Sequence, residues 1–144
     1  MQQEFKTSQG RIFLKMEYDP ENNWIYCNWI GYISPDSISL SITELGNLIK
    51  EKSCPYLLND NRELLGPWDK ANEKLEKEVF PKFIEYGLRY MAHVLAPNIA
   101  GALSAQDLHR RVNNTFQMHL FGDIEKAKAW LRDCQQKNEA NTNS

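Results

Sequence analysis

The chain alternates strand-like and helix-like segments, and this alternation restricts the fold more than any other feature of the sequence. Apolar residues recur at every second position from Ile12 to Tyr18, which is the period of a strand with one buried face. Turn-forming residues fill positions 19–23, and an aromatic and branched segment follows over residues 24–32. Two strands joined by such a short turn predict an antiparallel hairpin.

A long helix is predicted directly after the hairpin. Ser34 can cap the first turn with its hydroxyl, and Pro35 stands at the first helical position, where a backbone N–H is not needed. Apolar residues then recur at helical spacing through Ile38, Ile42, Leu45 and Ile49. This period predicts a helix over about residues 35–52.

A second helical stretch is interrupted by a proline. Its apolar stripe runs from Trp68 to Val79 through a highly charged segment. Pro81 lacks a backbone N–H and crowds the preceding turn, so we expect the helix to break or kink near Phe80. The apolar face ends at Gly87, which we expect to end the helix with a positive φ.

Three further strands are predicted over residues 56–58, 88–95 and 115–121. The first is a short apolar run of the kind found in buried strands. Residues 59–63, Asn-Asp-Asn-Arg-Glu, follow it directly. We therefore expect this strand to end in a polar loop.

Two more helices complete the pattern. Ser104 and Asp107 are spaced as in a capping box and predict a short helix, and Asp123 is the expected cap of a closing helix. The element order is then β-β-α-β-α-β-α-β-α. It predicts an α/β fold with a mixed, mostly parallel sheet of four to five strands, an N-terminal antiparallel hairpin and about four helices.

The length of 144 residues suits one domain. We expect an N-terminal extension over residues 1–10, the α/β domain over residues 11–134 and a disordered tail over residues 135–144, which is polar and has no apolar period.

Charge and cysteine content exclude several classes of function. The formal net charge of -2 gives no general attraction to nucleic acid or to an anionic membrane. Three cysteines without a CxxC spacing fit neither a disulfide framework nor a zinc site. No segment is apolar enough for a membrane span or a signal peptide. These features predict a cytoplasmic protein without membrane insertion.

Three local strings, together with the element order, resemble a known family. They are Leu57–Glu63 with Gly66-Pro67-Trp68, Val79–Gly87, and Phe121–Leu131. The chain resembles the SpoIIAA-like branch of the STAS superfamily, bacterial STAS-like proteins that have some CRAL-TRIO-like character. The resemblance implies a single SpoIIAA-like domain, protein partners or small ligands, and generally no catalysis. In the phosphorylation-switched members a serine follows an aspartate at a strand end, whereas Asn61 follows Asp60 here, so that switch is not expected.

The segment after the third strand is the first candidate site. Open α/β sheets usually bind ligands where parallel strands end, which selects Asp60, Asn61 and Arg62, with Trp68 beside them, for ligand or partner binding. Asp60 and Arg62 could instead brace a loop through their own hydrogen bonds. Likewise Trp68 and Trp29 could line a small pocket or simply pack in the core.

Other reactive residues suggest little chemistry. His93 and His119 lie on neighbouring predicted strands and could face the same side of the sheet, but no carboxylate or cysteine completes a metal site. Cys27 and Cys54 lie in apolar strands and should be inert. The sequence contains no P-loop, dinucleotide fingerprint, nucleophile elbow or zinc-protease helix, so we expect no metal, no cofactor and no catalytic residue.

These observations favour a non-enzymatic STAS-like module that binds a protein partner through its helices or an exposed edge strand, as a homodimer or with another protein. The alternative is a carrier or sensor of a small apolar or anionic ligand, held near Asp60, Arg62 and Trp68.

Overall fold

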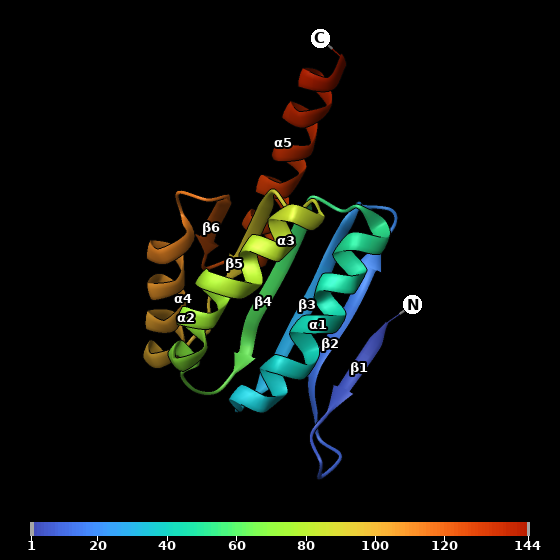
Figure 1. Ribbon diagram of the computed structural model, residues 1–144. Coiled ribbons are helices and arrows are strands. Elements are labelled where there is room, and N and C mark those ends of the chain that lie inside the picture. The colour runs from blue at the N-terminus through green and yellow to red at the C-terminus, as the bar shows by residue number, and fades with distance from the viewer. Residues whose placement is uncertain (1, 144) are drawn as a thin grey trace.

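A six-stranded mixed sheet forms the centre of the computed structural model, which describes residues 2–143 and the side chains of residues 2–140. The strands lie in the sheet in chain order (Figure 1). The first two pairs are antiparallel and the other three are parallel. The strands are β1 (Gln3–Lys6), β2 (Ile12–Asp19), β3 (Trp24–Gly31), β4 (Tyr56–Leu64), β5 (Tyr90–Val94) and β6 (Gln117–Phe121).

Helices cover both faces of this sheet. One face carries α1 (Pro35–Lys52), α2 (Asn72–Lys74), α3 (Phe80–Tyr86) and α4 (Ile99–Val112), and the other carries α5 (Ile124–Asn143) (Figure 1). A 3-10 turn over Asp69–Ala71 precedes α2, and a π-helical turn over Leu75–Val79 joins α2 to α3. The predicted α/β fold with an N-terminal antiparallel hairpin is therefore confirmed.

The core fills the space on both sides of the sheet. Side chains alternate along β4, so that Leu57 points toward α1 and α3 whereas Tyr56 and Leu58 point toward α5. All three are buried. Both faces of the parallel strands are therefore covered, as is usual for parallel sheets.

The first helix and its cap follow the sequence prediction. Ser34 is the N-cap, and its hydroxyl accepts a hydrogen bond from the backbone N–H of Ser37. The helix then runs to Lys52. Local capping chemistry and one apolar stripe were enough to define this element.

The second helical stretch breaks where the proline predicts. Pro81 has no N–H to donate to the carbonyl of residue 77, and the turn just before it is π-helical, with wider hydrogen-bonded rings. An α-helix resumes at Phe80 and ends at Tyr86, with Gly87 as its C-cap at a φ of +122°. The expected interruption and the expected positive φ are both confirmed.

The chain ends differ from the sequence expectation. Residues 1–10 were expected to be an extension, but Gln3–Lys6 pairs with β2 and adds a sixth strand. This strand contains one apolar residue, Phe5, whose ring lies 6.4 Å from that of Phe13. One apolar residue is too few to give a period, which explains why the strand was missed. Met1 lies outside the described residues.

The expected disordered tail, residues 135–144, is helical as far as Asn143; Ser144 lies outside the described residues. Gln135 donates from Nε2 to the backbone carbonyl of Asn22 at 2.6 Å, and Asn138 donates from Nδ2 to the Tyr56 hydroxyl at 3.1 Å. Polar side chains hold this segment, so an apolar period could not reveal it.

The predicted start of the helix between β5 and β6 was wrong. Its N-cap is Asn98, whose Oδ1 accepts from the N–H of Gly101 at 2.6 Å. Ser104 lies inside the helix, and its hydroxyl donates to the carbonyl of Ala100. A serine can make this internal bond as readily as it caps a helix, so its presence alone did not mark the helix start.

Candidate functional site

The polar segment after Leu58 is part of a strand and not a loop, which corrects the sequence prediction. β4 continues to Leu64. Relative to β3 it contains one additional residue, because Asn28 pairs with Asp60 whereas Ile30 pairs with Glu63. Such a β-bulge turns side chains away from strict alternation. The backbone N–H of Arg62, at this bulge, donates to Oδ1 of Asp60 at 3.0 Å.

The four predicted site residues fall into two groups on opposite faces of the sheet. Asp60 and Arg62 bind each other on the α5 face, together with Tyr26. Asn61 and Trp68 line a cavity on the face covered by α1 and α3. One ligand cannot contact all four residues at once.

Asp60 is fully engaged by its neighbours. It is 1% exposed and accepts from the Tyr26 hydroxyl at 2.6 Å and from Nε and Nη2 of Arg62 at 3.0 and 2.9 Å. Burial raises the pKa of Asp60, but the bonds from Arg62 and Tyr26 outweigh it and hold this pKa below its ordinary value. The Arg62 side chain is 50% exposed. This geometry fits the bracing role considered for the pair and leaves only Arg62 accessible.

A buried polar network lies on the other face of β4. Nε1 of Trp29 donates to Oδ1 of Asn59 at 2.7 Å, and Nδ2 of Asn59 lies 3.0 Å from Nδ1 of His93. Nδ2 of Asn61 lies 3.1 Å from the other ring nitrogen, Nε2. Burial lowers the pKa of His93 to about 4, although the charge of Asp60 acts in the opposite direction. The imidazole is therefore neutral near pH 7.

The network fixes the tautomer of His93. Because Oδ1 of Asn59 accepts from Trp29, the amide nitrogen of Asn59 must face Nδ1, which is then the ring acceptor. A neutral imidazole carries its one proton on the other nitrogen, Nε2. The ring is fully satisfied when the Asn61 amide turns its oxygen toward that proton. This network was not predicted from the sequence, where its signal was the polar pair Asn59 and Asn61 on the same strand face as Leu57.

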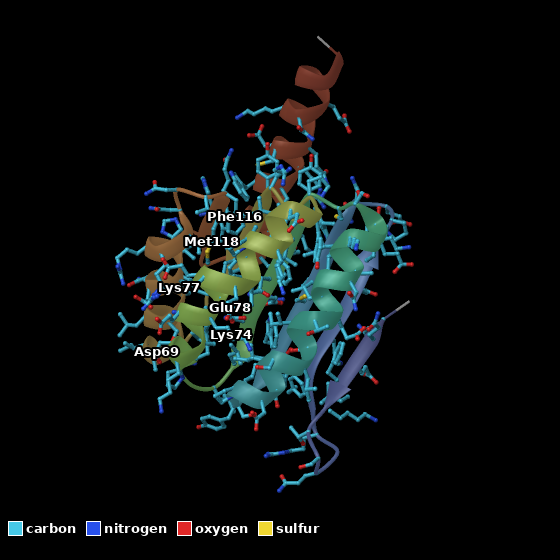
Figure 2. The ribbon with its side chains drawn as sticks, in the orientation of Figure 1. Asp69, Lys74, Lys77, Glu78, Phe116 and Met118 are labelled. Atoms are coloured by element: carbon cyan, nitrogen blue, oxygen red, sulfur yellow. The ribbon has the colours of Figure 1, made fainter. Side chains whose placement is uncertain are left out.

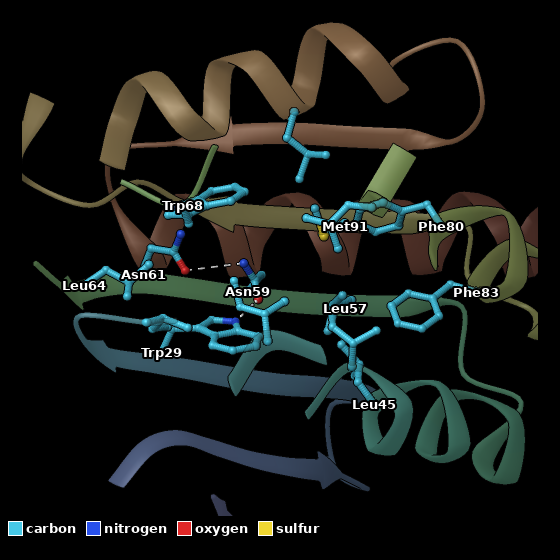
Figure 3. Close-up of a pocket in the computed structure, with 15 residues that line it drawn as sticks. Trp29, Leu45, Leu57, Asn59, Asn61, Leu64, Trp68, Phe80, Phe83 and Met91 are labelled. Atoms are coloured by element: carbon cyan, nitrogen blue, oxygen red, sulfur yellow. Dashed lines mark hydrogen bonds between the residues drawn. The ribbon is translucent and has the colours of Figure 1, made fainter. Parts of the chain in front are cut away.

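A cavity of about 60 Å³ adjoins the network. Figure 3 shows Asn59 and Asn61 at one side of it and Leu57, Met91 and Phe83 farther along. Trp68 also lines the cavity, and its ring lies 5.8 Å from that of His93. Nε1 of Trp68 is buried, with no hydrogen-bond acceptor among the described residues. The wall of the cavity is thus mostly apolar.

A wider groove lies next to the cavity, between α1 and the stretch from Lys70 to Tyr86, with a volume of about 840 Å³. Lys74, Lys77 and Glu78 lie along this stretch in Figure 2. Four apolar side chains line both the groove and the cavity, namely Ile38, Ile42, Leu75 and Phe83. The cavity and the groove are therefore adjacent.

Large apolar side chains are exposed where the parallel strands end. We call Tyr32, Leu65, Ile99 and Leu103 the strand-end patch; they are between 57% and 77% exposed. Hydrogen bonds join the segments that carry them: the backbone N–H of Leu65 donates to the carbonyl of Gly31 at 3.1 Å, and the side-chain Nδ2 of Asn98 donates to the carbonyl of Leu64 at 2.8 Å. Exposed apolar groups that gather in this way commonly mark a binding surface.

The two strand histidines face opposite sides of the sheet, which corrects the expectation that they could share one side. β6 places His119 opposite Ala92 and not opposite His93. His119 stacks on Trp130 of α5, with ring centroids 4.2 Å apart. Among residues 2–140 no group of three or more metal-binding side chains comes together.

Cys27 and Cys54 are buried and unpaired. Burial raises the pKa of both thiols, which disfavours the reactive thiolate. The basic last turn of α4, His109 to Arg111, is engaged locally, since Arg111 donates to Asp107 and Glu76, each at 2.9 Å. No helix that the structure describes is long and apolar enough to cross a membrane.

Comparison with known proteins identifies the fold. The sequence matches no family model, and no curated protein matches it significantly. The structure is similar to the crystal structure of an anti-sigma factor antagonist from Mycobacterium paratuberculosis, with a TM-score of 0.54 and 11% identity. The match covers 89% of this chain and 99% of the other. This chain has the STAS-like fold. The expected SpoIIAA-like architecture is thereby confirmed, and the STAS-like sheet places the bulged strand β4 at its centre.

Proposed function

We propose that this STAS-like chain is a non-enzymatic regulatory module that binds a partner protein through the strand-end patch. The observation that carries the proposal is the gathering of four exposed large apolar side chains at one end of the sheet. Apolar side chains of this size stabilise a complex when a partner removes them from water. The structural neighbour is an anti-sigma factor antagonist, and a regulatory role for this chain is consistent with that similarity.

The partner is a second copy of the chain or another protein. Arg62, half exposed at the same end of β4, adds a permanent positive charge near the patch. A partner with an apolar centre and an acidic rim would therefore fit. We place the complex in the cytoplasm, because all three cysteines are unpaired.

Native mass spectrometry of freshly purified protein, followed by affinity measurement with the species found, tests this proposal. We expect Leu65→Ser and Ile99→Ser to weaken the complex at least tenfold with little change in the melting temperature, because exposed side chains contribute little to folding. Leu40→Ser is the matched control: Leu40 is 73% exposed but lies on α1, outside the patch. Equal affinities for all three variants would exclude the patch as the interface.

A carrier or sensor of a small ligand is the second candidate function. The cavity beside Trp68 favours it, because aromatic and aliphatic side chains line it and two amide side chains, Asn59 and Asn61, lie at one side (Figure 3). In this candidate the ligand lies beneath α1 and not next to Asp60. Native mass spectrometry of the same sample would detect a retained small molecule as added mass on the monomer.

A further inference from the structure

Strand β1 forms one edge of the sheet and, among the described strands, pairs with β2 alone. The N–H of Thr7 donates to the carbonyl of Arg11 at 2.8 Å, so Thr7 turns its backbone groups toward β2. Because these groups alternate along an antiparallel strand, Phe5 also turns toward β2, whereas Glu4 and Lys6 turn theirs away from the sheet. The outward N–H and C=O groups can therefore pair with another strand.

The exposed side chains of this edge have opposite charges. Glu4 and Lys6 are exposed, and neither forms an ion pair with another described residue. They are two positions apart, so their side chains lie on one face of the strand and that of Phe5 lies on the other. Phe5 is partly buried, with its ring 6.4 Å from that of Phe13. The edge thus has one negative and one positive side chain on either side of a central phenylalanine.

A second copy of β1 complements this arrangement. When two copies run antiparallel about a two-fold axis at Phe5, Glu4 of each copy lies opposite Lys6 of the other, and these two residues exchange backbone hydrogen bonds. Opposite charges at such positions stabilise strand pairing. The two Phe5 residues form the pair without hydrogen bonds, in which side chains approach most closely. Backbone, charge and apolar contacts are therefore all satisfied by the same alignment.

Other alignments of the same strand are less favourable. A two-fold axis at Glu4 or at Lys6 places like charges opposite each other, and so does parallel pairing in register. Charged side chains on an edge strand usually prevent pairing with another chain. Here the opposite charges at alternate positions disfavour only the wrong registers.

The opposite edge of the sheet does not suit a second copy. β6 packs against α4, so two copies paired through β6 would bring two α4 helices onto neighbouring strands. Neighbouring strands are about 4.8 Å apart, whereas packed helices need about 8 to 10 Å between their axes. β1 has no such obstacle, because it mainly contacts β2 and lies clear of the helices in Figure 1.

We propose that two copies of the chain form a dimer by antiparallel pairing of their β1 strands about Phe5, which joins their two sheets into one. This inference goes beyond the proposed function, because the strand-end patch lies where the parallel strands end and not at this edge. The interface is small, so the dimer is weak and its population rises with protein concentration.

Sedimentation velocity over a concentration series tests this dimer. We expect Lys6→Glu to weaken it about tenfold or more, because Glu4 then meets a like charge across the axis. Lys126→Glu changes the net charge equally at an exposed position on α5, and this matched control should dimerise like the unmodified chain. An unmodified chain that stays monomeric at about millimolar concentration, or a Lys6→Glu variant that dimerises equally well, would overturn the proposal.

A mixture of two variants gives a sharper result. Glu4→Lys alone should also weaken the dimer, but an equimolar mixture of Glu4→Lys and Lys6→Glu should form heterodimers, since a positive strand then meets a negative one. A mixture that associates no better than either variant alone would contradict the pairing. Glu4 also lies opposite Lys15 on β2, so the melting temperature is used to confirm that Glu4→Lys remains folded.

Cysteine substitution locates the axis without changing these charges. Phe5→Cys places two thiols at a pair whose Cα atoms are about 4.5 Å apart, a separation that a disulfide can span. With oxidised glutathione, Phe5→Cys should cross-link about tenfold faster or more than Gln3→Cys, whose two copies lie at opposite ends of the paired strands. Equal rates would exclude this register. Leu65→Ser separates the two surfaces, since it should weaken the patch complex and leave the cross-linking rate of Phe5→Cys unchanged.

Discussion

At the scale of single residues, strand β4 has an ion-paired cluster on one face and a buried network of uncharged polar side chains on the other. In the cluster of Asp60, Arg62 and Tyr26, both carboxylate oxygens of Asp60 already accept hydrogen bonds from the other two residues. The network on the opposite face ends at His93, a histidine held neutral by burial. The two groups therefore respond differently to mutation and to pH.

His93 should make the stability of the fold depend on pH in the mildly acidic range. Its pKa is about 4 in the folded chain against 6.5 as the ordinary value, so the unfolded chain binds the proton first as pH falls. The free energy of unfolding should therefore decrease between pH 7 and pH 5, by about 2 kcal/mol from this residue. Urea denaturation at several pH values measures the loss.

His93→Gln is the informative variant for this pH dependence. It should be less stable than the unmodified protein at pH 7 and should show a flatter pH dependence above pH 5. His119→Gln, at a residue that stacks on Trp130 on the other face, is the control and should keep most of the slope. A slope unchanged in His93→Gln would show that other groups cause it.

Asp60 and Arg62 should differ in their contribution to stability. Asp60→Asn removes a buried charge that accepts bonds from Arg62 and Tyr26, and we expect it to lower the free energy of unfolding by about 2 kcal/mol. Arg62→Gln should lower it by about 1 kcal/mol or less, because the Arg62 side chain is half exposed and water screens the pair. Chemical denaturation checks both values, and equal losses would contradict this assignment.

At the scale of elements, local signals in the sequence identified the segments with one strong period and missed those held by polar contacts. The helix after Ser34 and the break before Pro81 both depend on local backbone chemistry. By contrast, the second half of β4 is polar because its side chains bond to β3 and β5. Contacts between strands far apart in sequence leave no period, so residues 59–63 looked like a loop.

Gly87 provides a test of one element boundary. Its φ of +122° is a conformation that side chains rarely adopt, although a Cβ there would meet only the backbone of Ser53 at 4.0 Å. We therefore expect Gly87→Ala to destabilise the fold by about 1 kcal/mol or more through backbone strain alone. Gly122→Ala, where φ is not positive and space is open, is the matched control. An unchanged denaturation midpoint for Gly87→Ala would contradict the strain.

At the scale of the whole molecule, the order of elements was enough to predict the α/β architecture. Strands that alternate with helices leave few topologies open. The candidate site was less predictable: Asn61 and Trp68 both line the cavity, but the cavity exists only because α1 and α3 are in position, and Asp60 and Arg62 lie on the other face of the sheet. The strand-end patch likewise combines residues from three loops or helix starts, which only the assembled sheet brings together.

The C-terminal half of α5 tests how far polar contacts alone extend the fold. Its buried apolar residues end at Cys134, and Figure 1 shows the last turns projecting past the sheet. Beyond that point the side chain of Gln135 donates to the backbone carbonyl of Asn22 in the turn before β3, and the side chain of Asn138 donates to the Tyr56 hydroxyl. A chain that stops at Cys134 should therefore lose about 1 to 2 kcal/mol in the free energy of unfolding, the scale of two or three partly exposed hydrogen bonds. Gln135→Ala should account for about half of this loss, whereas a frayed tail would give no loss in either variant. Slowed amide hydrogen exchange over residues 136–140 would independently support a folded helix.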